Sequence, residues 1–206
     1  MGYSKFKKIR QVKDSFNCQF ISIQIFDLTN IQPIQASSWL ETSLSYAYAT
    51  PPTNEKSKSE RIVSPILLEI ANKYKNRISF FSGEELNIDT KKNLTGPCDF
   101  FFALHPPSLL LESPIISIVE AKDEDLEWGI AQCAAQLYAA HLFNQKEDKN
   151  IPVLYGCATT GTEWHFMKYE PHANTFSIDL KPITELPYII GVWHTIIDFF
   201  IRNAKT

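Results

Sequence analysis

The spacing of apolar residues changes repeatedly along the chain, and each change marks an expected element. Apolar and polar residues alternate from Ile21 to Phe26, which is typical of a strand. Arg61 to Tyr74 instead carries apolar residues at helical spacing, although Ser64 and Pro65 form a good helix start inside this range, so two start points are open. A nearly continuous β-branched run from Pro114 to Ala121 is typical of a central strand buried on both faces.

The same periodicities predict the remaining elements. Helices are expected over 37–48, 125–143 and 186–201, and strands over 77–88, 98–104, 152–158, 164–169 and 175–180. The central order is therefore helix, three strands, helix and strand, followed by a hairpin and a last helix. Successive strands followed by a helix and a crossover strand predict a mixed sheet with helices packed on it, an α/β fold of the α+β mixed-sheet kind.

Length and loop composition favour a single domain over residues 1–206. The stretch 51–59 is rich in Pro, Asn, Lys and Ser, which predicts a loop. We place there the junction between an N-terminal elaboration, 1–58, and a core, 59–169. The remaining residues, 170–206, are expected to add a hairpin strand and the last helix.

Composition narrows the functional classes. The chain is 44% hydrophobic with a net charge of -3, so any nucleic-acid contact must come from a local basic patch or a bound cation. No apolar run reaches the length of a membrane helix, and the basic, polar start lacks the apolar segment of a signal peptide. Four scattered cysteines and five histidines without ligand spacing predict no zinc or redox motif and favour a cytoplasmic location.

Three polar residues interrupt the apolar strands in a pattern that carries chemistry. Asp99 follows a turn at the start of one strand, while Glu120 and Lys122 end the most apolar strand and project to the same face. Charges at a buried strand end are costly unless they are paired or bind an ion. We therefore expect Asp99, Glu120 and the carbonyl of Ala121 to hold Mg²⁺ (or Mn²⁺), which prefers oxygen ligands. Lys122 is expected to serve the nucleophile or the phosphate.

Asp99 followed by Glu120-Ala121-Lys122 at the end of an apolar strand resembles the PD-(D/E)xK, or restriction-endonuclease-like, superfamily. The segment Pro97-Cys98-Asp99 departs from a strict Pro-Asp by one residue, and the resemblance covers 59–169. The chain also looks like a group of uncharacterised bacterial, notably cyanobacterial, proteins with Gly-x-x-Gln-Cys after the motif (here 129–133) and Thr-Thr-Gly further on (here 159–161). The resemblance implies a core of helix, three strands, helix and strand that binds Mg²⁺ and cuts or binds nucleic acid.

The helix after this motif carries a polar stripe. Asp125, Gly129, Gln132 and Gln136 are spaced by four, three and four residues and therefore share one face. Glutamines favour a face that lines the active-site cleft, where Gln132 and Gln136 would touch phosphate or orient Lys122. The alternative is the ordinary solvent-facing stripe of an amphipathic helix.

The resemblance also implies that the first core helix supplies a glutamate to the metal. Glu69, which lies in an apolar context, is the candidate we favour, and Glu60 is the alternative. The structural explanations are a surface glutamate at position 69 and a favourable helix-dipole interaction at position 60.

The sequence therefore predicts a Mg²⁺-dependent nuclease in which activated water attacks a phosphodiester. Its partner would be a nucleic acid, with DNA favoured over RNA, and the aromatic C-terminal helix could supply a homodimer interface. One rival is a catalytically inactive protein of the same fold that serves as a nucleic-acid-binding or structural module. Metal binding by Asp99 and Glu120 separates these two. A third possibility, an unrelated α/β domain with coincidental acidic residues, fails if the carboxylates converge in a cleft.

Overall fold

The computed structural model describes residues 2–122 and 125–204, which form one seven-stranded mixed sheet with helices on both sides. The strands are β1 (Gln19–Ile23), β2 (Ser79–Glu85), β3 (Pro97–Ala103), β4 (Ile115–Ala121), β5 (Leu154–Thr159), β6 (Trp164–Glu170) and β7 (Thr175–Asp179). The main helices are α1 (Ile9–Phe16), α2 (Ser38–Ala49), α3 (Glu55–Lys58), α4 (Ser64–Lys73), α5 (Leu126–Lys146) and α6 (Leu186–Asn203). Their order confirms the predicted succession of helix, three strands, helix, strand, hairpin and last helix.

The sheet has the spatial order β1-β7-β6-β5-β4-β3-β2. Strands β2, β3 and β4 pair antiparallel, as do β5, β6 and β7. Two parallel pairs complete the sheet, β4 with β5 and β7 with β1. The chain passes from β4 to its parallel neighbour β5 through α5, because parallel neighbours need a crossover connection.

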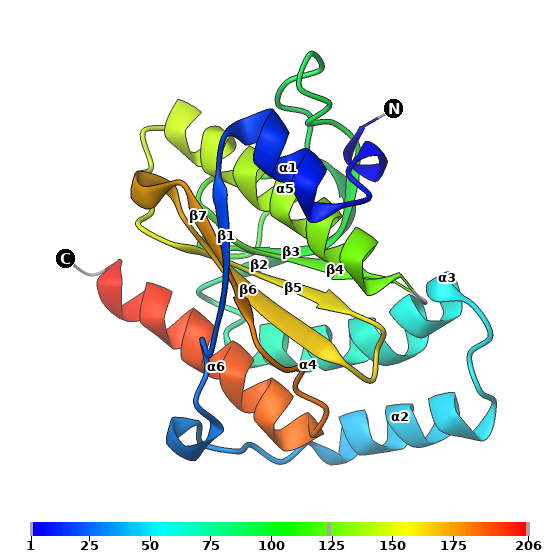
Figure 1. The fold of residues 1–206 in the computed structure, drawn as a ribbon. Coiled ribbons are helices and arrows are strands. Elements are labelled where there is room, and N and C mark those ends of the chain that lie inside the picture. The colour runs from blue at the N-terminus through cyan, green and yellow to red at the C-terminus, as the bar shows by residue number, and fades with distance from the viewer. Residues whose placement is uncertain (1, 123–124, 205–206) are drawn as a thin grey trace.

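Each face of the sheet buries its own hydrophobic cluster, and Figure 1 shows the helices in two layers. Helices α1 and α5 cover one face, while α4 and α6 cover the other and α2 lies beyond α4. Every residue of β4 is buried, which confirms that this strand is central and covered on both faces. Polar side chains at the C-terminal end of β4 are therefore shielded from solvent.

The expected loop at 51–59 is wrong for its second half, which is helical. The side chain of Asn54 accepts a hydrogen bond from the backbone of Ser57, whose hydroxyl accepts one from the backbone of Asn54, so this capping box starts α3. A short π-helix, Ser59–Val63, then joins α3 to α4. The sequence left open whether this helix begins at Arg61 or at Ser64. Helix α4 begins at Ser64, although the chain is already helical before it.

Two features near the N-terminus also differ from the expectation. Helix α1 was not predicted, because its short length leaves only Val12 and Phe16 to mark a buried face. Strand β1 begins earlier than the alternating pattern indicates, and Ile21 is 42% exposed. Since β1 is an edge strand, its contact with the core is limited to side chains such as Phe20, whose ring stacks on Phe176 at 4.8 Å.

Candidate active site

Asp99 and Glu120 lie near the adjacent ends of two neighbouring strands. Asp99 is the third residue of β3, and Glu120 is the second-last residue of β4. The Asp99 carboxylate accepts a hydrogen bond from the backbone N–H of Ala121 at 2.8 Å. This bond holds the carboxylate against the end of β4, so the two acidic residues meet although they are far apart in the sequence.

The carboxylate of Glu120 is enclosed by protein, and each of its oxygens has a specific neighbour. The Lys122 ammonium lies 2.8 Å from one oxygen, and the side-chain amide of Gln136 on α5 donates to the other at 2.8 Å. Glu120 and Lys122 project from β4 toward the face that α5 covers. A buried carboxylate in this arrangement is held by one cation and one neutral donor.

The ammonium of Lys122 has two further neighbours. Its Nζ atom lies 3.3 Å from the carboxylate of Glu55 on α3, and it stands over the ring of Trp128 at 5.3 Å. Trp128 in turn lies beneath the ammonium of Lys7, at 4.9 Å. Lys122 is therefore placed between two carboxylates and an aromatic face, where a cation is stabilised.

Burial and neighbouring carboxylates raise the pKa of both carboxyl groups, with Asp99 acting on Glu120 and Glu55 acting on Asp99. Burial, and after it the nearby charge of Asp99, raise the pKa of Glu120 to about 8, while Lys122 and Gln136 oppose the shift. Burial also raises the pKa of Asp99, against the hydrogen bond from Ala121. Two carboxylates that repel each other in a buried place form a site that an added cation stabilises.

The glutamines of the polar stripe of α5 face the sheet and not the solvent. Gln132 and Gln136 are both buried, and a side chain at Gly129 would collide with Lys122. Asp125, the first residue of the stripe, caps the helix by accepting a hydrogen bond from the backbone of Trp128. The solvent-facing alternative is therefore wrong for the two glutamines.

Glu69 does not join this cluster, which corrects the expectation for the first core helix. Its carboxylate accepts hydrogen bonds from the backbone and the hydroxyl of Ser37, at the start of α2. The N-terminus of a helix is a favourable place for a carboxylate, and this contact holds Glu69 there. The alternative, Glu60, lines the same hollow as Asp99.

Glu55 is the site residue that sequence reasoning missed. It was assigned to a loop, yet α3 brings it to Lys122 and to the hollow that Asp99 lines. The capping box of Asn54 and Ser57 is the signal that could have found the helix.

Asp99 lines a hollow of about 470 Å³, whereas the enclosed Glu120 is not among its lining residues. Its lining residues are Glu55, Lys56, Ser59, Glu60, Ser64, Ser82, Gly83, Asp99 and Phe100. The charge of Asp99 nevertheless raises the pKa of Glu120, so the two acidic residues lie near each other, although only Asp99 lines the hollow.

The donor groups around Glu120 fit a hydrated divalent cation. Among the described residues, no three His, Cys, Asp or Glu side chains are arranged to hold a metal by themselves, and Asp123 and Glu124 lie outside those residues. Mg²⁺ commonly takes one or two carboxylates and keeps several waters. The amide oxygens of Gln132 and Gln136 are enclosed and accept no hydrogen bond within the described part of the chain. Such unpaired oxygens could accept hydrogen bonds from the water molecules that a divalent cation keeps.

A scan against protein-family models and a search of curated proteins found no match for this chain. Within the described residues, no helix combines the length and the apolar character needed to cross a membrane.

Proposed function

We propose that this protein is a divalent-metal-dependent nuclease with a restriction-endonuclease-like core of the PD-(D/E)xK type. The observation that carries the proposal is the buried carboxylate of Glu120, held between Lys122 and Gln136, with Asp99 fixed beside it by the backbone of Ala121. Phosphodiester hydrolysis needs oxygen ligands for a hard cation and a positive group for the developing charge, and this cluster offers both.

The arrangement of elements supports the proposal. Helix α4 is followed by the antiparallel strands β2, β3 and β4, and α5 then leads to β5, which is parallel to β4. This is the order that the resemblance implies, and it sets the motif residues at neighbouring strand ends. Glu55, which belongs to the helical run ahead of α4, takes the place that we expected for Glu69.

Asp99, Glu120 and the carbonyl of Ala121 would hold Mg²⁺ or Mn²⁺. Such a cation supplies Lewis-acid polarisation of the phosphoryl oxygen and makes water more acidic. Asp99 keeps a fixed orientation because one of its oxygens accepts from the Ala121 backbone. Gln136 holds the Glu120 carboxylate by its second oxygen, so that neither carboxylate must reorganise when a phosphate arrives.

Lys122 acts as a hydrogen-bond donor and not as a base. Burial lowers the pKa of its ammonium, but the carboxylates of Glu120, Glu55 and Asp99 outweigh burial, and the pKa is raised. Beside a substrate phosphate, the Lys122 ammonium would stabilise the negative charge of the transition state.

Metal titration joined to a cleavage assay tests the proposal. Wild type, Asp99→Asn and Glu120→Gln are titrated with Mn²⁺ by calorimetry and incubated with labelled single-stranded DNA, double-stranded DNA and RNA. We expect both variants to lose Mn²⁺ binding and cleavage together. Lys122→Met should keep Mn²⁺ binding and lose cleavage by about a hundredfold or more, because it removes only the donor to the developing charge.

The matched control is Glu127→Gln, which removes an exposed carboxylate from the first turn of α5 and should change neither readout. Mn²⁺ binding by the wild type without cleavage of any substrate would favour the catalytically inactive, nucleic-acid-binding module. A wild type that binds no Mn²⁺, with or without nucleic acid, would overturn the metal site and the nuclease together.

A further inference from the structure

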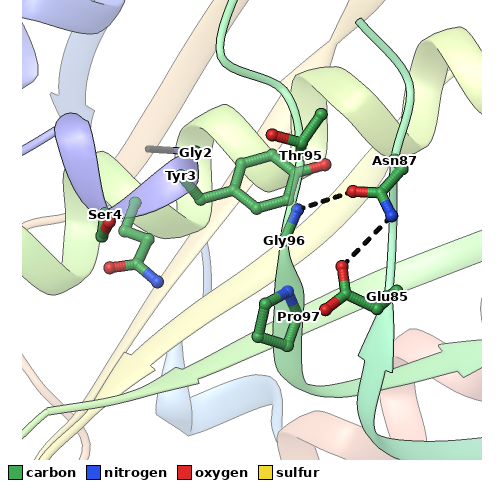
Figure 2. A pocket seen from close by; sticks show the side chains of 9 residues that line it. Gly2, Tyr3, Ser4, Glu85, Asn87, Thr95, Gly96 and Pro97 are labelled. Carbon is green, nitrogen blue, oxygen red and sulfur yellow. Dashed lines mark hydrogen bonds between the residues drawn. The ribbon is translucent and has the colours of Figure 1, made fainter. Parts of the chain in front are cut away.

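A second hollow has a volume of about 470 Å³, and Figure 2 shows the residues that line it. It lies between the N-terminal segment and the connection from β2 to β3, and its lining includes Tyr3, Glu85, Asn87, Gly96, Pro97 and Gln132. Two of these residues lie close in the sequence to residues of the candidate active site. Pro97 is two residues before Asp99, and Gln132 is one helical turn before Gln136. A volume of this size is typical of small-molecule sites.

The wall formed by the N-terminal segment is firmly held. The Tyr3 hydroxyl donates to the carbonyl of Leu86 at 2.5 Å, and the Tyr3 backbone donates to the carbonyl of Thr95 at 3.1 Å. A side chain at Gly2 would lie 1.9 Å from that same Thr95 oxygen, so only glycine fits there. The hollow therefore has a preformed shape.

The polar lining combines a carboxylate acceptor with an amide. One oxygen of Glu85 accepts from the side chain of Asn87 at 3.2 Å, and the Asn87 oxygen accepts from the backbone of Gly96 at 2.9 Å (Figure 2). Gln132 is only 9% exposed, and its amide oxygen is enclosed without a hydrogen-bond partner among the described residues. Because Gln132 lines the hollow while its oxygen is enclosed, we infer that the amide N–H₂ is the polar group it presents there.

A basic segment follows this wall. Lys5, Lys7 and Lys8 are exposed, directly after the residues that line the hollow, and Lys7 lies over Trp128 near Lys122. The chain as a whole carries a net charge of -3, so this is a local positive patch beside an acidic site. Exposed lysines in such a place bind the phosphates of a nucleic-acid strand.

Resting on the proposed nuclease function, we propose that this hollow binds an unpaired guanine base of the substrate strand. The N1–H and N2–H₂ groups of guanine donate to the Glu85 carboxylate, and its O6 accepts from the Gln132 amide. Lys7 and Lys8 contact the neighbouring phosphates. Because these atoms belong to the pairing edge of the base, the nucleotide must be unpaired, and the substrate is single-stranded at this position.

Binding of free nucleosides tests the hollow without metal, phosphate or cleavage. Guanosine, inosine, adenosine and uridine are titrated separately into ¹⁵N-labelled protein, and the backbone N–H of Gly96 and the side-chain amide of Gln132 report binding by NMR. We expect guanosine to bind tightest and inosine, which lacks the N2 amino group, to bind more weakly. Glu85→Gln and Gln132→Leu should each weaken guanosine binding by roughly tenfold.

The control is Glu84→Gln, which removes an exposed carboxylate from the neighbouring position of β2 and should leave guanosine binding unchanged. Equal response to all four nucleosides, or guanosine binding unaffected by both Glu85→Gln and Gln132→Leu, would overturn the base site. Its failure leaves Mn²⁺ binding and cleavage unaffected. Guanosine binding in a protein that binds no Mn²⁺ would support the hollow while removing the nuclease.

Discussion

The position of the Lys122 side chain depends on the absence of a side chain at Gly129. A β-carbon added at Gly129 would lie 2.9 Å from Cγ and 3.5 Å from Cβ of Lys122, and 3.4 Å from Cβ of Ala158. The first distance is too short, so Lys122 would have to shift. Helix α5 can therefore approach the end of β4 closely only because this residue is glycine.

Gly129→Ala should separate activity from stability. Alanine is favoured over glycine inside a helix by about 1 kcal/mol, which offsets the displacement of a flexible side chain, so the unfolding free energy should change by less than about 1 kcal/mol. Cleavage should fall about tenfold or more, because Lys122 leaves its position beside Glu120. Urea unfolding and the cleavage assay check the two effects.

The same substitution at Gly156 gives the contrast. A β-carbon there would lie 2.7 Å from Leu137 and 2.9 Å from Cys133 in the packed core, so Gly156→Ala should lose about 1–3 kcal/mol of stability by overpacking.

A fully active Gly129→Ala protein would show that the position of Lys122 does not limit the reaction.

At the scale of elements, the register of α5 on β4 decides which residues of the helix reach the site. Near its end, the buried side chain of Asn144 accepts from the backbone N–H of Ile115 at 2.8 Å and donates to the Ile115 carbonyl at 2.7 Å. These bonds join the last turns of α5 to the first residue of β4. With this end fixed, Gln136 comes to lie opposite Glu120.

Asn144→Leu should therefore be strongly destabilising. It leaves the N–H and the carbonyl of Ile115 buried without their partner, at a cost of about 1–3 kcal/mol for each group. The urea midpoint measures the loss. Gln145→Leu, at the exposed neighbouring position of the same helix, is the matched control and should change stability little. Equal midpoints for the two variants would contradict a role for Asn144 in joining the elements.

At the scale of the whole molecule, the half-buried histidines and the buried Glu120 change the stability with pH in opposite directions. Burial lowers the pKa of His141, His165 and His194, so the unfolded chain binds protons at these residues more readily than the native protein. Stability from these residues is lost as pH falls below about 6.5. The raised pKa of Glu120 works the other way, because its contribution is lost as pH rises toward about 8.

The variant His194→Gln isolates the contribution of one histidine to the pH dependence of stability. Relative to wild type, His194→Gln should become more stable as pH falls from about 7 to about 5, because only the wild type takes up a proton at residue 194 on unfolding. The difference in unfolding free energy, measured in urea at a series of pH values, checks the prediction. A difference that stays constant over this range would contradict the lowered pKa of His194.

Most aromatic side chains of the C-terminal helix α6 pack against the core of the same molecule. Trp193 packs edge-on against Phe102 and Phe166, and Phe200 is buried beside Tyr155. Phe199 differs from Trp193 and Phe200 because its side chain is 37% exposed. A homodimer through this helix stays a prediction.

The sequence by itself determined the order and type of the core elements, because the apolar periods are local and strong. The continuous apolar run of β4 and the helical spacing of α4 and α5 needed no tertiary information, and both appear in the structure. The capping residues of α3 were visible too, but a short helix in a polar stretch lacks the apolar face that marks a longer one.

The sequence also singled out Asp99, Glu120 and Lys122 as unusual, since charged residues at the ends of apolar strands need a reason to be there. Only the tertiary structure decided which glutamate joins them. Glu69 is drawn to the N-terminus of α2, while Glu55 reaches Lys122, and both outcomes depend on contacts between segments far apart in the chain. Local patterns carry no information on such contacts, because they arise only when the helices pack around the sheet.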